Sequence, residues 1–444
     1  MDTSSLITGK HRSKIGALQN PSAETIEYAK SLNLHNLGPG ELAVGEWEAA
    51  GLPLPDMPYI RRYRLERLRE QLRKHDYAGI LLYDPLNTRY ATDSTNMQLW
   101  VTHNAARYVF VATEGPVVIF EFAHCEHVNS HNPLITEIRP AISWFYFISG
   151  DRTPEMVERW ADEIADLVTQ HGGGNNRLAI DRCNFEGIRA LEKRGVEIFN
   201  GEEVMEIARS IKCEEEIKAM RCAIVACDRS IDIMKAHMVP GVSEQRLWSY
   251  LHAENISRGG EWIETRIMAS GPRTNPWFQE CSSRKIEAGD IVAFDTDLIG
   301  PYGMCVDISR TWICGDVTPT PKQRELYTMG YEQIQKNREL LSPGRTFKEL
   351  TLDSLQYDAN EFRRYSVTYH GVGLCDEYPG IYFADQWESF GYDGVLQPGM
   401  VMCVETYVSR PTGGEGIKLE DQVLITETGH ELLSHYPFEQ ALLL

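Results

Sequence analysis

The sequence predicts a two-domain protein of the α/β (α+β) class. The chain has 444 residues, which exceeds what one typical hydrophobic core accommodates. Strand-like apolar runs alternate with helix-like segments up to about residue 200, a pattern typical of a compact α/β domain. A long helical stretch over 203–238 follows, and helices and strand-like runs alternate again to the end. We therefore expect an N-terminal arm over 1–58, an α/β domain over 59–202 and a second domain over 203–444.

The arm and the first domain differ in composition. Residues 1–58 are rich in Gly, Pro, Ser and Asn, which indicates an extended segment that wraps a partner subunit or stays disordered. Residues 59–75 carry leucines at helical spacing, so we expect an amphipathic helix there. The elements expected next are a buried strand (77–84), a hairpin (107–122) that turns at Glu114–Gly115, a helix (158–171) and a strand (177–181).

Charge and composition exclude several classes of protein. The formal net charge is −20, so nucleic acid would be repelled and a small zwitterionic substrate tolerated. No apolar run reaches the length of a membrane span, and the N-terminus lacks the apolar core of a signal peptide. We therefore expect a cytoplasmic protein that binds neither nucleic acid nor membranes. The 10 cysteines form no C-x-x-C pair, which indicates reduced, structural thiols.

Acidic residues inside apolar, strand-like runs of the second domain point to a functional site. Burying a carboxylate is costly unless it is paired or bound to a metal. Each residue alone could serve one buried hydrogen bond, but the whole set is explained more simply by a metal centre. The set comprises Asp295, Asp297, Asp307, His370, Glu405 and Glu420. Such oxygen and nitrogen donors suit Mn, Fe, Co or Zn, and this many carboxylates favour two bridged ions about 3.5–4 Å apart.

The strings around these residues resemble the creatinase, prolidase and methionine aminopeptidase superfamily (M24), whose catalytic domain has the pita-bread fold. The matching strings are GDIVAFD, VDISRTW, HGVGL, PGMVMCVET and GIKLEDQVLIT. The resemblance begins at about residue 60 and implies a creatinase-like N-terminal α/β domain followed by a pita-bread catalytic domain. The ligands it implies are Asp295 or Asp297, Asp307, His370, Glu405 and Glu420.

The chain departs from the peptidases of this superfamily at two histidines. After HGVGL the peptidases have a second histidine, whereas here Asp376 and Glu377 follow in a string that is one residue shorter. Before SSRKI a further family histidine is replaced by Trp277 and Phe278. These histidines stabilise the intermediate and protonate the leaving amine, so their loss argues against amide hydrolysis. Smaller departures are an extra residue in the aspartate segment, with Asp297 inside it, Thr406 in place of proline and Lys418 in place of arginine.

This combination resembles the DddP-type dimethylsulfoniopropionate lyases, a family within the superfamily that releases dimethyl sulfide and acrylate. The resemblance implies a homodimer with two divalent ions, iron first and manganese, cobalt or zinc as alternatives. An X-Pro dipeptidase or aminopeptidase is the alternative function, and a creatinase-like hydrolase ranks third. A non-catalytic binding module is disfavoured because the metal-ligand positions are all intact.

Elimination would fit the substituted residues. A carboxylate base would remove the proton next to the substrate carboxylate, and Asp376 is the candidate, with a turn cap as the alternative role. A sulfonium leaves as a neutral sulfide and needs no general acid. An aromatic face attracts such a cation by roughly 0.5–2 kcal/mol. Trp277 and Phe278 are candidates for that face, unless they are ordinary core aromatics, and the family resemblance adds Tyr365.

Overall fold

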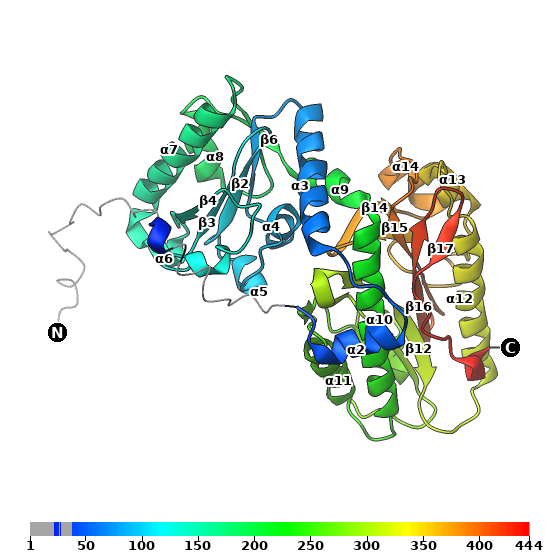
Figure 1. Cartoon of the computed structure of the whole chain (residues 1–444). Coiled ribbons are helices and arrows are strands. Elements are labelled where there is room, and N and C mark those ends of the chain that lie inside the picture. Colours follow the sequence, from blue (N-terminus) through cyan, green and yellow to red (C-terminus); the bar gives the residue numbers. More distant parts are fainter. Residues whose placement is uncertain (1–21, 26, 28–37, 444) are drawn as a thin grey trace, which may run out of the picture. The chain divides into compact units, whose positions relative to one another are not determined.

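The computed structural model describes residues 22–25, 27 and 38–443, which divide into two compact units (Figure 1). Residues 72–202 belong to the first unit, and residues 38–71 join 203–443 in the second. The predicted arm lies partly outside the described residues. Within them, Glu41–Ala49 form helix α2, whose Trp47 is fully buried and donates a hydrogen bond to the Cys222 carbonyl at 2.7 Å. This part of the chain is therefore helical and packed.

The first unit is built on a six-stranded mixed sheet in the order β4-β3-β2-β1-β5-β6. Strands β2 and β3 form the predicted antiparallel hairpin. Trp160 and Ile164 of α7 pack with Leu81 and Phe110 of the sheet in one buried core. The strands are β1 (Gly79–Leu82), β2 (Tyr108–Ala112), β3 (Val117–Glu121), β4 (Glu137–Pro140), β5 (Arg177–Ile180) and β6 (Glu197–Asn200). The helices are α4 (Pro85–Thr92), α5 (Gln98–Val101), α6 (Tyr146–Ser149), α7 (Thr153–His171) and α8 (Phe185–Glu192).

The helices of the second unit include α3 (Met57–Lys74), of which residues 57–71 belong here although the sequence pattern suggested the first domain. A buried ion pair links this helix to the second unit, since Arg64 Nε lies 2.6 Å from Glu216 Oε1. The other helices are α9 (Glu202–Ser210), α10 (Glu214–Ala236), α11 (Glu244–Ser257), α12 (Pro321–Glu339), α13 (Phe347–Asp353) and α14 (Trp387–Phe390).

The predicted helical stretch over 203–238 is interrupted, because α9 ends at Ser210 and α10 begins at Glu214. Cys213 is extended, and Glu216 accepts its backbone N–H at 3.1 Å in a capping box. Reciprocal capping of this kind starts a new helix. Lys212, in the break, turns its ammonium inward to the buried Glu377.

Three sheets complete the second unit, and helix α12 packs on the largest of them. That sheet has the order β14-β13-β15-β16-β17, and the smaller ones are β12-β9-β8 and β11-β10-β7. The strands are β7 (Trp262–Ile263), β8 (Met268–Ser270), β9 (Ile291–Asp295), β10 (Leu298–Ile299), β11 (Cys305–Val306), β12 (Ser309–Ile313), β13 (Tyr369–Val372), β14 (Asp376–Ile381), β15 (Val401–Ser409), β16 (Gly416–Ile425) and β17 (His430–Leu432).

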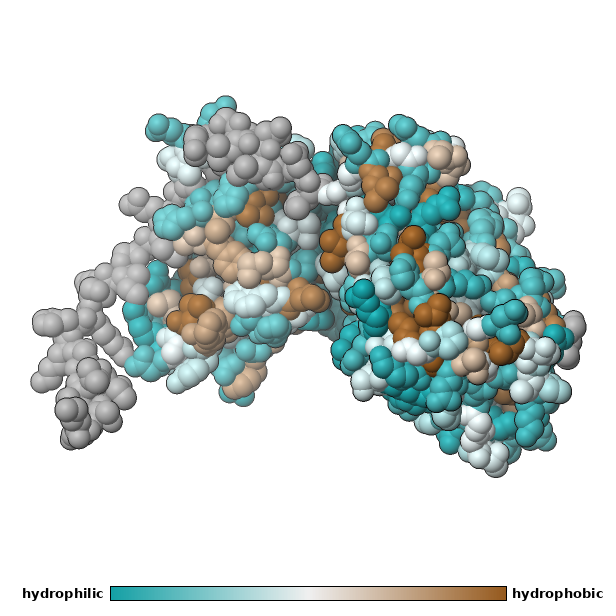
Figure 2. All heavy atoms as spheres, turned by 90° about the horizontal axis from the view of Figure 1, so that it is seen from below, coloured by the Kyte–Doolittle hydropathy of each residue, from teal (hydrophilic) through white to brown (hydrophobic). Residues whose placement is uncertain are grey.

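The surface offers no extended apolar belt on the side that Figure 2 shows, where apolar and hydrophilic side chains alternate in small patches. Among the described helices, none combines the length and the apolar character that crossing a bilayer requires.

Candidate metal centre

One face of the five-stranded sheet carries the histidine and both glutamates. Glu405 of β15 lies directly opposite Glu420 of β16. His370 of β13 lies opposite Cys403, which precedes Glu405 by two residues in β15. Side chains two residues apart along a strand share a face. The register alone therefore places the imidazole, the thiol and both carboxylates on one surface.

The aspartate segments meet in the smaller sheet β12-β9-β8. Asp295 ends β9 and pairs with Ser309, the first residue of β12. The hydroxyl of Thr296 donates to the carbonyl that precedes Asp307 (2.7 Å) and accepts the N–H that follows it (2.9 Å). This side chain thereby fixes the backbone on both sides of Asp307. Asp297 has a φ of 37°, in the left-handed region that aspartate tolerates better than most residues.

Lys418 supplies a buried positive charge to this acid cluster. Its Nζ lies 3.0 Å from Asp295 Oδ2, 3.0 Å from Glu405 Oε2 and 2.7 Å from Glu420 Oε2. The hydroxyl of Ser309 lies 2.6 Å from Asp295 Oδ1 and 2.8 Å from Glu420 Oε2. One lysine thus faces three carboxylates, and the cluster retains an excess of acidic groups.

His370 is oriented for metal binding through Nε2. This nitrogen lies 3.2 Å from Glu420 Oε1 and 3.5 Å from both Asp307 Oδ2 and Glu405 Oε1. The other nitrogen, Nδ1, lies 3.0 Å from the carbonyl oxygen of Gly371. A carbonyl acceptor favours the tautomer with the proton on Nδ1, which leaves the Nε2 lone pair toward the acids.

Burial and mutual repulsion raise the pKa of most acids in the cluster, whereas nearby basic groups lower the pKa of Glu420. Burial, followed by the charge of Glu420, raises the pKa of Asp307 well above its ordinary range. Burial also raises the pKa of Glu405 well above its usual value, despite the nearby Lys418. For Glu420, burial acts upward, but Lys418 and His370 outweigh it and hold its pKa below the ordinary value. A bound cation would relieve the repulsion that favours protonation of Asp307 and Glu405.

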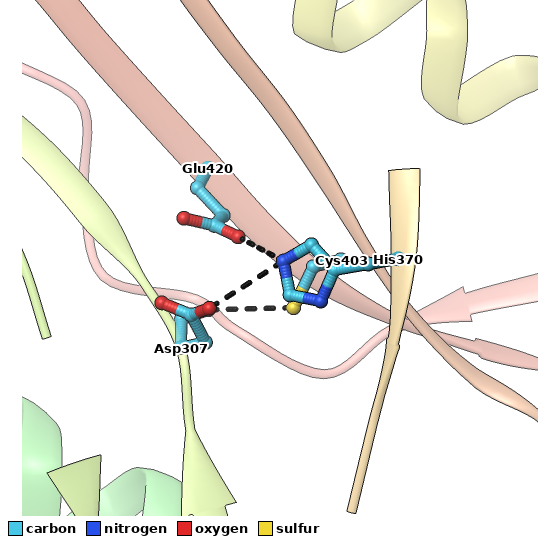
Figure 3. A group of neighbouring side chains, drawn as sticks. All are labelled: Asp307, His370, Cys403 and Glu420. Carbon is cyan, nitrogen blue, oxygen red and sulfur yellow. Dashed lines mark hydrogen bonds and ion pairs between the residues drawn. The ribbon is translucent and has the colours of Figure 1, made fainter. Parts of the chain in front are cut away.

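Two groups of side chains that share Asp307 each bring their ligand atoms within 4.8 Å of one another. Asp307 Oδ1 is buried and accepts no hydrogen bond, and Glu405 has only ion-pair contacts. Orphaned buried carboxylate oxygens beside an imidazole fit a divalent cation. The first group, drawn in Figure 3, is Asp307, His370, Cys403 and Glu420, and the second is Asp297, Asp307 and Asp376.

The two candidate aspartates of the first segment have different surroundings. Both oxygens of Asp295 are engaged, Oδ1 by Ser309 and Oδ2 by Lys418. Asp297 belongs to the second ligand group, and its Oδ2 accepts a hydrogen bond from Thr265 Oγ1 at 2.7 Å. Asp297 is thus the one of the two that belongs to a group of potential metal ligands with Asp307, whereas the Asp295 carboxylate is held by Ser309 and Lys418.

Asp376 stands at the open side of the cluster. It is the first residue of β14, and its side chain is 51% exposed, with Oδ1 3.8 Å from His370 Nδ1. The next residue, Glu377, is fully buried and pairs with Arg209 and Lys212. Side chains alternate between the two faces of β14, so Glu377 points into the protein and Asp376 lies beside the acid cluster.

The three predicted aromatic residues adjoin the same region. The ring of Phe278 stacks on Tyr365, with 5.2 Å between centroids, and that of Trp277 stacks on Tyr407 at 5.7 Å. Lys418 Nζ lies 4.4 Å from the Tyr365 centroid, which connects the aromatic residues to the acids. Phe278 is 59% exposed and Trp277 only 7%. Trp277 is therefore a core residue here, and Phe278 keeps an accessible face.

Sequence reasoning missed several residues of the site. It omitted Cys403, Ser309 and Thr265, and it noted Lys418 only as a replaced arginine. Strand alternation was an available signal for three of them: Cys403 precedes Glu405 by two residues, Lys418 precedes Glu420 by two, and Ser309 follows Asp307 by two. Thr265 lies far from these strands in sequence and had no comparable signal.

Similarity to known proteins places the chain in a family. Residues 218–427 match metallopeptidase family M24, and residues 64–211 match the creatinase/prolidase N-terminal domain. The chain belongs to family M24, in the two-domain form with a creatinase-like N-terminal domain. Among its curated relatives is a dimethylsulfoniopropionate lyase DddP from Roseovarius nubinhibens, 49% identical, with 93% of this chain and 94% of that protein covered.

Other relatives are peptidases at greater distance. An Xaa-Pro dipeptidase from Pyrococcus furiosus is 32% identical over 76% of this chain and 95% of its own length. The solved structure of an Xaa-Pro dipeptidase from Bacillus anthracis superimposes with a TM-score of 0.67 at 26% identity, covering 85% of this chain and 98% of that one. These similarities confirm the predicted fold class, a creatinase-like domain followed by a pita-bread catalytic domain.

Proposed function

We propose that this chain is a metal-dependent carbon–sulfur lyase that cleaves dimethylsulfoniopropionate into dimethyl sulfide and acrylate. The observation that carries the proposal is Asp376, a half-exposed carboxylate beside His370 at the open side of the acid cluster. A base at this position suits removal of a proton from carbon. The 49% identical relative that bears the name of this lyase supports the same substrate.

The elimination requires one base and no acid. A bound divalent ion would act as a Lewis acid on the substrate carboxylate and make the adjacent carbon more acidic. The Asp376 carboxylate takes the proton from that carbon. The electron pair of the broken C–H bond becomes the second bond of the alkene, and the C–S bond breaks. Sulfur keeps its electron pair and leaves as neutral dimethyl sulfide, and acrylate remains.

We assign the predicted ligands to this centre as a proposal. Their convergence on one buried cluster, together with the orphaned Asp307 oxygen, supports two divalent ions, and we take iron as the native metal. The ligands would be drawn from Asp295, Asp297, Asp307, His370, Glu405 and Glu420, as predicted. A homodimer in the cytoplasm completes the proposal, in line with the family resemblance.

Headspace gas chromatography of the purified protein with dimethylsulfoniopropionate tests the activity, with an X-Pro dipeptide assay beside it. We expect dimethyl sulfide from the wild type, suppressed by a chelator, and at least about a 100-fold lower rate from Asp376→Asn. Metal analysis of Asp376→Asn should give the wild-type content, which separates a base from a ligand. Dipeptide cleavage without sulfide release would favour the peptidase alternative.

Asp307→Ala tests the metal centre itself, because this carboxylate belongs to both ligand groups. We expect it to lose bound metal and lyase activity together. Full activity in a protein shown to hold no metal would contradict the metal-dependent mechanism.

A further inference from the structure

Cys403 directs its sulfur into the acid cluster. The residue is the third of β15, is fully buried, and pairs across the sheet with His370. Directly opposed residues have their Cβ atoms about 4.5–5.5 Å apart on the same face. Figure 3 shows the sulfur beside the imidazole and the Asp307 carboxylate.

The thiol has the neighbours of a metal ligand. Its Sγ and one ligand atom each of Asp307, His370 and Glu420 lie within 4.8 Å of one another. Its hydrogen bond is a long one, 3.9 Å to the Asp307 carbonyl. A buried cysteine often serves only as a small apolar residue. Here, however, the thiol lies beside Asp307, which has a carboxylate oxygen without a hydrogen bond, and beside His370 Nε2. Both side chains offer an atom that can coordinate a metal ion.

We propose that Cys403 is a metal ligand of this centre, through its thiolate. On binding, a sulfur–metal bond forms and the thiol proton passes to water. Together with His370, Asp307 and Glu420 it would give one ion a mixed set of sulfur, nitrogen and oxygen donors. A soft thiolate favours zinc, cobalt and ferrous iron over manganese and magnesium. The ligand therefore makes the centre selective among divalent ions, a property that carboxylates alone would not supply.

The inference rests on the metal centre proposed above and is independent of the substrate. Its test uses metal-free full-length protein titrated with cobalt(II), followed by optical spectroscopy. Wild type should develop the near-ultraviolet sulfur-to-cobalt charge-transfer absorption, and Cys403→Ser should lack it. Cys314→Ser, which removes another buried thiol of the same unit, should keep it. In competition between zinc and manganese, Cys403→Ser should lose zinc affinity by about tenfold or more relative to manganese.

A second measurement needs no variant. Both thiols are buried, so alkylation of the folded protein is slow and is followed over time by mass spectrometry, with unfolded protein giving the full labelling of each thiol. Zinc should slow the labelling of Cys403 relative to metal-free protein and leave the labelling of Cys314 unchanged. A Cys403→Ser protein with the same charge-transfer absorption and the same zinc preference as wild type would overturn the proposal. If the wild-type protein binds no metal at all, the proposed metal centre is contradicted as well. That outcome is distinguishable from the one in which Cys403→Ser binds metal as wild type does.

Discussion

Lys418 is the only lysine or arginine side chain described within 3 Å of the acids Asp295, Glu405 and Glu420. Removing one partner of a buried ion pair typically costs about 3–5 kcal/mol, because the remaining charges lose their compensation. We therefore expect Lys418→Met to lower the melting temperature of metal-free protein strongly. The loss should shrink in metal-loaded protein, since the ions themselves neutralise the acids. Calorimetry of both forms checks this difference.

The matched control for Lys418 is Lys418→Arg, which keeps the charge in a larger side chain. It should retain most of the metal-free stability that Lys418→Met loses. Equal destabilisation of Lys418→Met with and without metal would mean that the lysine acts through packing alone.

Phe278 offers the accessible aromatic face near the centre. A cation–π contact with the sulfonium would contribute about 0.5–2 kcal/mol, so Phe278→Ala should raise KM about 2- to 30-fold with a smaller change in kcat. Phe278→Leu keeps apolar area and removes the aromatic face. If Phe278→Leu kept the wild-type KM, the contact would be merely apolar. Steady-state kinetics on the three proteins decides this.

At the scale of elements, the register of β13, β15 and β16 shows which part of the site could be predicted from the sequence and which could not. The apolar runs around Glu405 and Glu420 predicted strands, and burial of acids within them predicted a metal centre. Strand pairing is set by long-range contacts, so the opposition of His370 and Cys403 could not be predicted from local pattern. For the same reason, the hydrogen bond from Thr265 to Asp297 could not be predicted, because it joins segments 32 residues apart.

Strand β14 is anchored by a buried acid next to the proposed base. Glu377 pairs with Lys212 and, at 3.2 Å, with Arg209 Nε, so the last turn of α9 and the segment after it hold the start of β14. Glu377→Gln would leave the buried Lys212 without its counter-ion and would remove one of the two acids that pair with Arg209. We expect a loss of about 3–5 kcal/mol in unfolding free energy. Urea unfolding followed by tryptophan fluorescence measures it. Exposed Glu388→Gln is the control, and a similarly small effect in both variants would show that this anchor is dispensable.

At the scale of the whole molecule, the sequence predicted two units and the class of each, because strand and helix periodicities are local properties. The predicted start of the first domain at residue 59 stays a prediction. In the structure, the Arg64–Glu216 pair links residues 57–71 to the second unit. The break between α9 and α10 was missed, because Cys213 is an unusual cap residue and the leucine-poor helical pattern continues across it.

Global stability should depend on pH through Asp228 of α10. Burial, the largest effect, raises its pKa from 3.8 to about 7 in the folded chain. A raised pKa means that the folded state holds the proton more tightly, so stability is greatest below the unfolded value and falls as pH rises toward 7. Asn mimics the neutral acid at every pH. Asp228→Asn should therefore match wild type near pH 4 and exceed it increasingly up to pH 7, with a constant advantage above.

Melting temperatures between pH 4 and 8.5 check this, and at pH 8 we expect Asp228→Asn to melt at least about 3 °C higher than wild type. Taking the difference between the two proteins cancels the contribution of the acids in the metal centre, which titrate in both. Asp166→Asn, an exposed position on α7, serves as the control and should follow the wild-type curve. A pH-independent offset between Asp228→Asn and wild type would mean that the substitution acts through packing, because a neutralised charge can stabilise the fold only where the acid would otherwise ionise.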